Sequence, residues 1–375
     1  MNKKIPWWTP EIGRMEYALV NDVLGSNYIN EGDVTAEFER RIATLCGVNH
    51  AVAVTSGTAA LALALVGLGV GSGDEVLVPD ITFIATANAV TLAGARPVLV
   101  DIDPRTLGID PEAAERAMTS RTKAIIPVHV SGRAAAIDAI QAVAREHGIF
   151  VVEDAAEAFL SRHAGRYLGT FGQAGCLSFS PNKTITTGQG GVILTNDPRL
   201  EVRLRELKDQ GRPVRGTGGD DVHHSIGFNF KLTNLQAAIG IGQLAYLETR
   251  LARLKQIYAI YKDGLAGVDG IMLPGFRIEE GESPQWVDAI VRHRDELDRY
   301  LLERNVHCRR FWFPIHTQAP YRDSDDRFPN SNRTARHALW LPSAFTLSDD
   351  DVNAVCAYIC EFSRRIRTES AETTV

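Results

Sequence analysis

The sequence has no apolar run near the roughly 20 residues that a membrane-spanning helix needs, and it has no block of like charges. Its formal net charge is -6. The stretch MNKKIPWWTPEIGRMEY places Pro6 and charged residues where a signal peptide has a continuous apolar core. These absences argue against export and against a membrane or nucleic-acid partner. They predict a cytoplasmic protein whose partner is a small molecule.

Cysteine is scarce, and a nicotinamide-binding fingerprint is missing. The five cysteines are odd in number and scattered, which argues against a disulfide framework. Cys356 and Cys360 share a helix face, but no second pair of ligands stands near them, so we expect buried thiols and no metal site. The glycine-rich stretch GLGVGSGD follows a predicted helix and does not match G-x-G-x-x-G, which argues against an NAD-dependent oxidoreductase.

Short apolar runs alternate with helical stretches through the first two-thirds of the chain. The runs are HAVAVTS, DEVLVPD, RPVLVDI, KAIIPVHV, IFVVEDA, GCLSFS and GGVILTN. Several are apolar throughout, which is typical of strands buried on both faces of a parallel sheet. Helical stretches such as 59–68 and 137–147 lie between most of them. The sequence therefore predicts an α/β fold with a seven-stranded, mostly parallel sheet between layers of helices.

Near residue 245 the pattern changes to a long charged helix, QLAYLETRLARLKQIYAIYKDGL, and the strand signals become fewer. We therefore predict a large domain over residues 1–245 and a smaller C-terminal α/β domain over residues 246–375. The last stretch, RTESAETTV, is small and polar, which predicts disorder.

The stretch VTSGTAALALAL predicts a strand that ends near Val54 and a helix that follows it. Ser56 stands at the N-cap position, and the amides of Gly57 and Thr58 come next, at the positive end of the helix dipole. Such a helix start at the carboxyl edge of a sheet can bind a phosphate. A well-capped structural helix gives the same pattern, so this stretch leaves both interpretations open.

The stretch VVEDAAEAF places Asp154 at the carboxyl end of an apolar strand, where open α/β sheets bind their ligands. A buried carboxylate needs a cationic or hydrogen-bonding partner to offset its lost hydration, and a protonated pyridine nitrogen is one such partner. A helix N-cap and a metal site with Glu153 and Glu157 are the alternatives. Adjacent residues of a strand point to opposite faces, which disfavours the metal site.

The stretch SFSPNKTITTGQGG places Lys183 beyond the end of another predicted strand, which ends near Ser178. A partly buried lysine is an amine nucleophile that forms a Schiff base with an aldehyde. A phosphate anchor, a partner for a pyridine nitrogen and a Schiff-base lysine are the groups that pyridoxal 5'-phosphate (PLP) requires. The three motifs together, in this order along the chain, predict a PLP enzyme.

At these motifs the sequence resembles the sugar-nucleotide aminotransferases of the DegT/DnrJ/StrS family. The resemblance runs from NYINEGDVTAEFERRIATLCGVNHAVAVTSGTAAL through TFIATANAV and GFNFKLTNLQAAIGIGQL to FPIHTQAPY, nearly the whole chain. It implies the aspartate-aminotransferase fold (PLP fold type I) and a transamination. By position, Lys183 is similar to the lysine that binds the cofactor, and Asp154 to the partner of its ring nitrogen. Gly57, Thr58 and Ser178 are similar to the family's phosphate contacts.

The same resemblance suggests roles for four further residues. Phe83 is similar to the aromatic residue that stacks on the cofactor ring, with a core phenylalanine as the alternative. Glu157 is similar to a residue near the cofactor's phenolic oxygen. Asn229 resembles the asparagine that reaches the phosphate from the neighbouring subunit, which implies a homodimer with shared active sites. His316 lies in a loop that is near the substrate in the family, with a structural histidine as the alternative.

Within the family, the stretches VEDAAEA, NKTITTGQGG and FPIHTQAPY most resemble the branch that forms GDP-perosamine. This implies GDP-4-keto-6-deoxymannose as the nucleotide-sugar acceptor and L-glutamate as the amino donor. The alternatives are an aminotransferase for another UDP- or dTDP-linked 3- or 4-keto sugar and a non-catalytic PLP-binding regulator. Two departures from the family pattern stand out: the serine in VHVSG, where an aromatic residue is usual, and Gln189, where glutamate is common.

Overall fold

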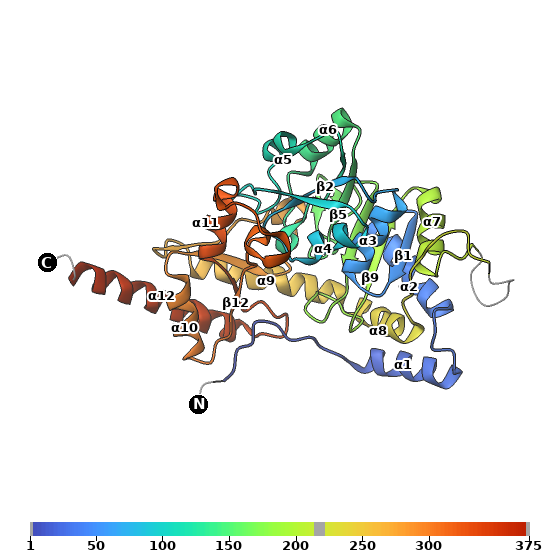
Figure 1. The fold of residues 1–375 in the computed structure, drawn as a ribbon. Coiled ribbons are helices and arrows are strands. Elements are labelled where there is room, and N and C mark those ends of the chain that lie inside the picture. The colour runs from blue at the N-terminus through green and yellow to red at the C-terminus, as the bar shows by residue number, and fades with distance from the viewer. Residues whose placement is uncertain (1–2, 214–221, 373–375) are drawn as a thin grey trace.

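The structure of the protein is a computed structural model that describes residues 3–213 and 222–372 (Figure 1). Its larger sheet contains β1 (His50–Val54), β2 (Glu75–Pro79), β3 (Arg96–Val100), β4 (Thr122–Ile125), β5 (Phe150–Asp154), β8 (Ala174–Ser178) and β9 (Gly191–Thr195). The order in this seven-stranded sheet is β1-β9-β8-β5-β4-β2-β3. Strand β9 runs antiparallel to β1 and β8, and the other pairs are parallel. Each strand coincides with a predicted run, so the fold prediction is confirmed.

Helices cover both faces of this sheet. One face carries α3 (Gly57–Gly67), α4 (Ala85–Leu92) and α7 (Pro198–Lys208). The other carries α2 (Asp33–Cys46), α5 (Pro111–Ala117), α6 (Ile137–His147) and α8 (Asn234–Leu244). In β2, Val76 and Val78 pack into the first layer, whereas Leu77 packs into the second. Full burial of such a side chain contributes roughly 1.5–3 kcal/mol, which explains why the strands are apolar at successive positions.

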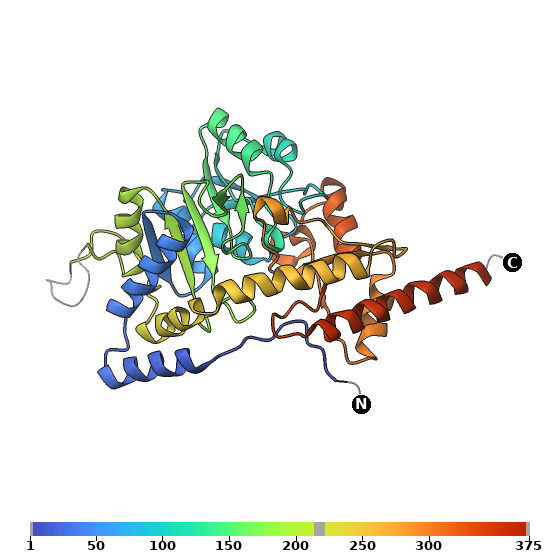
Figure 2. The same ribbon diagram turned by 180° about the vertical axis from the view of Figure 1, so that it is seen from behind.

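The second sheet is smaller and antiparallel, with the order β10-β11-β13-β12. Its strands are β10 (Ile271–Met272), β11 (Val287–Val291), β12 (Arg309–Arg310) and β13 (Ala338–Leu341). Helices α9 (Leu247–Gly264), α10 (Arg294–Leu302) and α12 (Asp349–Glu372) share its apolar core. Figure 2 shows α9 running from beneath the larger sheet to the smaller one, with α12 beside it. The remaining α-helices and strands of the described residues are α1 (Arg14–Ser26), α11 (Pro329–His337) and the antiparallel pair β6 (Arg162–His163) and β7 (Arg166–Tyr167).

Two expectations concern the C-terminal part. The change of pattern near residue 245 falls between α8 and α9, and the division into two domains there stays a proposal. Helix α12 extends as far as Glu372, and the disorder expected from Arg367 onward stays a prediction. Arginine, glutamate and alanine favour helix, so a helix that begins in the core extends through them. Residues 373–375 lie outside the described residues. No helix in the described part is long and apolar enough to cross a membrane.

An aromatic cluster joins the two sheets. It contains Trp7, Trp286, Phe311, Trp312 and Trp340, and it packs against apolar side chains that follow strands of the larger sheet. The ring centroids of Trp286 and Trp340 lie 4.9 Å apart in an edge-to-face arrangement, which is favourable for aromatic pairs. The smaller sheet is thereby held against the carboxyl edge of the larger one.

Candidate active site

A cavity of about 280 Å³ lies at the carboxyl edge of the larger sheet, where β1, β5 and β8 end. This is the edge at which open α/β sheets bind ligands. The cavity is lined by most of the predicted site residues: Gly57, Thr58, Phe83, Asp154, Glu157, Ser178 and Lys183. Asn229 and His316 are not among its lining residues. Segments that are far apart in the sequence thus line one cavity, and its volume is near that of small-molecule binding sites.

One end of the cavity is built from a helix start and hydroxyl groups. Ser56 caps α3, since its hydroxyl accepts a hydrogen bond from the Ala59 amide at 3.1 Å. The Ala59 amide is thereby occupied, and the amides of Gly57 and Thr58, residues that line the cavity, are left at the positive end of the helix dipole. The Ser178 hydroxyl lies 3.0 Å from that of Ser180. A Cβ at Gly191 would lie 2.3 Å from the Ser56 carbonyl oxygen, so glycine is required for this close approach. This end has the donors that a phosphate needs.

Asp154 ends β5 as a buried carboxylate with no ion-pair partner among the described residues. Its Oδ2 accepts a hydrogen bond from Thr86 at 2.8 Å, and its Oδ1 accepts one from the Ala156 amide at 3.2 Å. Burial raises the pKa of Asp154, which the hydrogen bond from Thr86 partly offsets. A cationic ring nitrogen would supply the missing charge partner.

The two alternatives for Asp154 are not supported. No helix begins at Asp154, because β5 is followed by turns and then by β6. Glu153 points away from Asp154 and is occupied: its Oε2 lies 2.9 Å from Nε2 of His129 and accepts the Gly169 amide at 2.8 Å. The carboxylate is therefore neither a helix cap nor one of a pair of metal ligands with Glu153.

Lys183 and Glu157 face each other in the cavity. Lys183 Nζ lies 3.5 Å from Glu157 Oε1 and 4.6 Å from the ring centroid of Trp286. Burial lowers the pKa of Lys183, while the carboxylates of Glu157 and Asp154 oppose the shift. Burial raises the pKa of Glu157 to about 7. A lysine in this setting has access to its neutral, nucleophilic form.

Phe83 precedes α4, and its side chain is exposed at the cavity. The residue is 53% exposed, so the alternative of a core phenylalanine is wrong. Its ring stacks on no other aromatic ring of the described residues. An exposed flat ring beside Asp154 and Lys183 is suited to contact with a planar cofactor ring.

Comparisons with known proteins place the chain in a family. The family model of the DegT/DnrJ/EryC1/StrS aminotransferases matches residues 10–360. The chain belongs to this family. The GDP-perosamine synthase of Escherichia coli O157:H7 is 36% identical over 365 residues, which are 96% of this chain and 99% of the relative. The GDP-perosamine synthase of Caulobacter vibrioides is 37% identical over 356 residues, 93% and 95% of the two chains.

A solved structure agrees with this assignment. Spr1654 of Streptococcus pneumoniae, in its PMP form, has a TM-score of 0.93 at 27% identity and covers 98% of this chain and 100% of its own. It has also been solved in the PLP form. The enzyme is therefore a PLP-dependent sugar-nucleotide aminotransferase, and the family implies a sugar nucleotide and an amino donor as its substrates. These residues fit PLP. The end of the cavity at the start of α3 suits its phosphate, Asp154 without an ion-pair partner suits its ring nitrogen, and the buried Lys183 suits its aldehyde.

Glu157 in this aminotransferase allows a test of pH dependence. Its folded pKa is about 7 and its ordinary value is 4.5. Between these two values the folded state holds a proton that the unfolded chain has released, so stability falls as the pH rises through this window. Glu157→Gln should remove this decline. In thermal unfolding of the PLP-free protein, the variant should gain in melting temperature over the wild type from pH 4.5 towards pH 7. A difference in melting temperature between the variant and the wild type that stays the same from pH 4.5 to pH 7 would contradict the raised pKa of Glu157.

Asn229 and His316 lie outside the cavity. Asn229 is exposed and forms an isolated bridge with Asp209, so its predicted contact with the phosphate of a neighbouring subunit stays a prediction. His316 is fully buried in a short turn. Its Nδ1 lies 2.7 Å from Asp80 Oδ2, its Nε2 lies 3.0 Å from Asp325, and its ring stacks on Phe328. For His316 the geometry favours the structural alternative over substrate binding.

His316→Ala should therefore destabilise this enzyme without changing how it binds substrate. The change removes the side-chain partner of the buried Asp80 and leaves it only the backbone amide of residue 316 from this turn. This loss should lower the free energy of unfolding by about 3 kcal/mol. Urea unfolding measures this loss, and the KM of the folded variant for the sugar nucleotide should stay near that of the wild type. A raised KM for the sugar nucleotide with an unchanged free energy of unfolding would instead assign His316 to substrate binding.

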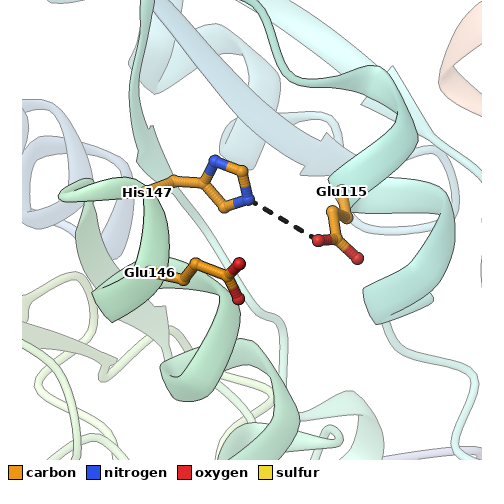
Figure 3. A group of neighbouring side chains, drawn as sticks. All are labelled: Glu115, Glu146 and His147. Carbon is orange, nitrogen blue, oxygen red and sulfur yellow. Dashed lines mark ion pairs between the residues drawn. The ribbon is translucent and has the colours of Figure 1, made fainter.

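His147→Ala is a suitable control for that experiment. His147 belongs to an exposed group with Glu115 and Glu146, in which His147 Nε2 lies 3.6 Å from Glu115 Oε1 (Figure 3). A surface pair of this kind contributes at most about 1 kcal/mol. We assign no function to this group.

Several cavity residues of the aminotransferase were not predicted from the sequence. Trp286, Trp312 and Trp340 form a wall of the cavity, and Arg309 joins them. All four come from the smaller sheet or the segments that flank it. Trp312 and Trp340 stand within the short apolar runs FWF and LWL, and Trp286 begins the run WV. This pattern indicates strands and does not indicate which of the tryptophans face a ligand.

Proposed function

We propose that the enzyme converts GDP-4-keto-6-deoxymannose to GDP-perosamine, with L-glutamate as the amino donor. The observation that carries the reaction class is the buried Lys183 beside two carboxyl groups at a phosphate-binding edge. The choice of sugar is supported by the printed names of the relatives, which are 36% and 37% identical over almost their whole length. The cytoplasmic location expected from the sequence stays a prediction.

The roles of the residues follow from their positions. We assign the phosphate of PLP to Gly57, Thr58 and Ser178, and its ring nitrogen to Asp154. Bound PLP supplies an electron sink that makes the proton on the donor's amine-bearing carbon acidic.

Lys183 lies where it can bind the aldehyde carbon of PLP and then, as a free amine, move that proton. Glu157 lies 3.5 Å from this amine and can hold its proton. Phe83 covers the ring and limits access of water.

We also propose that the active unit is a homodimer with shared sites. Side chains on and after α1 support this, because Tyr17, Tyr28 and Ile29 are apolar or aromatic and exposed. Ile226 is 91% exposed and stands close to Asn229 in the chain. A second copy that covers these side chains would bring Asn229 to the phosphate end of its partner's cavity.

A panel of nucleotide sugars tests the substrate. The purified protein is incubated with PLP, L-glutamate and, separately, GDP-4-keto-6-deoxymannose and UDP- or dTDP-linked 3- and 4-keto sugars. Mass spectrometry then detects the aminated product. We expect the GDP-linked sugar to give the highest kcat/KM. A higher value for a UDP- or dTDP-linked sugar would overturn the sugar assignment and leave the reaction class intact. PLP binding without amination of any sugar would favour the non-catalytic regulator.

A further inference from the structure

Arg309 is a charged residue of the cavity to which the roles above give no function. It lies on β12 opposite Trp340 of β13. Across residues 3–213 and 222–372 its guanidinium has no hydrogen-bond or ion-pair partner. The next residue differs, because Arg310 pairs with Asp295 at 3.2 Å and with Asp298 at 3.4 Å. An unpaired guanidinium in a ligand cavity is available to bind an anion.

The guanidinium of Arg309 lies near aromatic rings. The Arg309 guanidinium carbon lies 4.8 Å from the ring centroid of Trp7 and 5.7 Å from that of Trp340. Both rings adjoin Trp286, on which the Lys183 amine rests. Contact with aromatic faces stabilises the cation and orients its planar fork. Arg309 is an exposed residue, and its charge lies on the same aromatic cluster that supports the reacting lysine.

Arg309 also lies within electrostatic reach of Lys183. Burial is the main cause of the lowered pKa of Lys183, and the positive charge of Arg309 adds to the shift. The charged residues that line the cavity are Asp154, Glu157, Lys183 and Arg309. The first three have roles towards the cofactor. Arg309 is the remaining cation of this lining, and it has no role towards the cofactor.

The chemistry of the two substrates decides which anion suits this position. An amino acid carries a carboxylate on the carbon that bears the reacting amine, so its negative charge arrives close to Lys183. In a nucleotide sugar the diphosphate is attached to C1, and the sugar ring separates it from a keto carbon at position 3 or 4. The cavity of about 280 Å³ also has to hold PLP, so the space beside the cofactor is small and suits the compact amino acid better than a nucleotide sugar. A whole nucleotide sugar has to extend beyond it.

We propose that Arg309 binds a carboxylate of the amino donor and thereby selects an amino acid over an uncharged amine. This inference rests on the proposed function, since it concerns the donor of the same site. A guanidinium can bind a carboxylate through two parallel hydrogen bonds, and it does so here without losing an existing partner.

The test compares Arg309→Gln and Arg309→Lys with Arg310→Gln, a matched control whose arginine pairs on the surface. Calorimetry measures the Kd of glutarate, an unreactive dicarboxylate, for each PLP-loaded protein. Steady-state kinetics give the KM values of L-glutamate and of the nucleotide sugar. We expect Arg309→Gln to raise the Kd of glutarate and the KM of L-glutamate by about tenfold to hundredfold. For Arg309→Lys, both values should lie between those of the wild type and those of Arg309→Gln. The KM of the nucleotide sugar should change by less than about twofold in either variant.

The other outcomes overturn the proposal. An unchanged Kd of glutarate in Arg309→Gln removes Arg309 from donor binding. A larger loss for the nucleotide sugar than for L-glutamate means that the guanidinium binds the diphosphate. An equal loss in Arg310→Gln means that the effect is not specific to the cavity. Failure of the proposed function looks different, because then the wild-type protein forms no 2-oxoglutarate from L-glutamate, whatever the variants do.

Discussion

Lys183→Ala is expected to lower kcat by at least about 10³-fold, because one side chain supplies both the nucleophile and the proton carrier. Lys183 is the only lysine that lines the cavity among the described residues. Its burial lowers the pKa of the amine, so that the neutral form is accessible. The variant should still fold, since Glu157 already has a raised pKa and can stay protonated without its partner. Steady-state kinetics and circular dichroism measure the two effects.

Lys183→Arg is the control that separates chemistry from charge. Arginine keeps a positive charge beside Glu157, but its guanidinium stays protonated at every working pH and does not add to an aldehyde. If Lys183 served only as the ion-pair partner of Glu157 at 3.5 Å, arginine would restore activity. We expect both variants to be inactive. Activity of Lys183→Ala within about tenfold of the wild type would remove the lysine from the mechanism.

The fold was predictable from the sequence because its signals are local. Strands buried on both faces are apolar at successive positions, as the burial of Val76, Leu77 and Val78 shows. Helix ends are also local signals. Gly148 ends α6 in the left-handed region, at a φ of 64°, and Ser56 begins α3 as its cap. Such features depend on neighbouring residues, so a single sequence carries them.

The residues that line the cavity were predictable only in part, because several of them reach it through contacts that are not local in the sequence. Gly57, Asp154 and Ser178 follow or end strands of one sheet, so topology alone brings them to one edge. The aromatic wall and Arg309 come from the smaller sheet, and the position of that sheet depends on packing across the whole chain. His316 shows the same limit. Its partner Asp80 stands 236 residues earlier, and no local pattern reveals that contact.

Asp154→Asn is expected to lower kcat by about 10² to 10³-fold, the usual effect of losing one preorganised electrostatic contact. The amide has the shape of the carboxylate. Its oxygen can still accept the hydrogen bond from the Ala156 amide, and its NH2 group can donate to the Thr86 hydroxyl oxygen. It carries no negative charge, so it cannot hold a protonated ring nitrogen, and the electron sink is weakened. Turnover measured at saturating PLP and L-glutamate gives the size of this loss.

The stability of the PLP-free variant then shows whether Asp154 is functional or structural. A buried carboxylate without a charge partner destabilises the folded state, as the raised pKa of Asp154 indicates. Asp154→Asn should therefore unfold at a temperature equal to or above that of the wild type, although it is nearly inactive. Glu153→Gln is the matched control, because its carboxylate is hydrogen-bonded to His129 and Gly169. That variant should lose stability. A loss of stability in Asp154→Asn as large as that of the control would mean that Asp154 supports the fold and not the reaction.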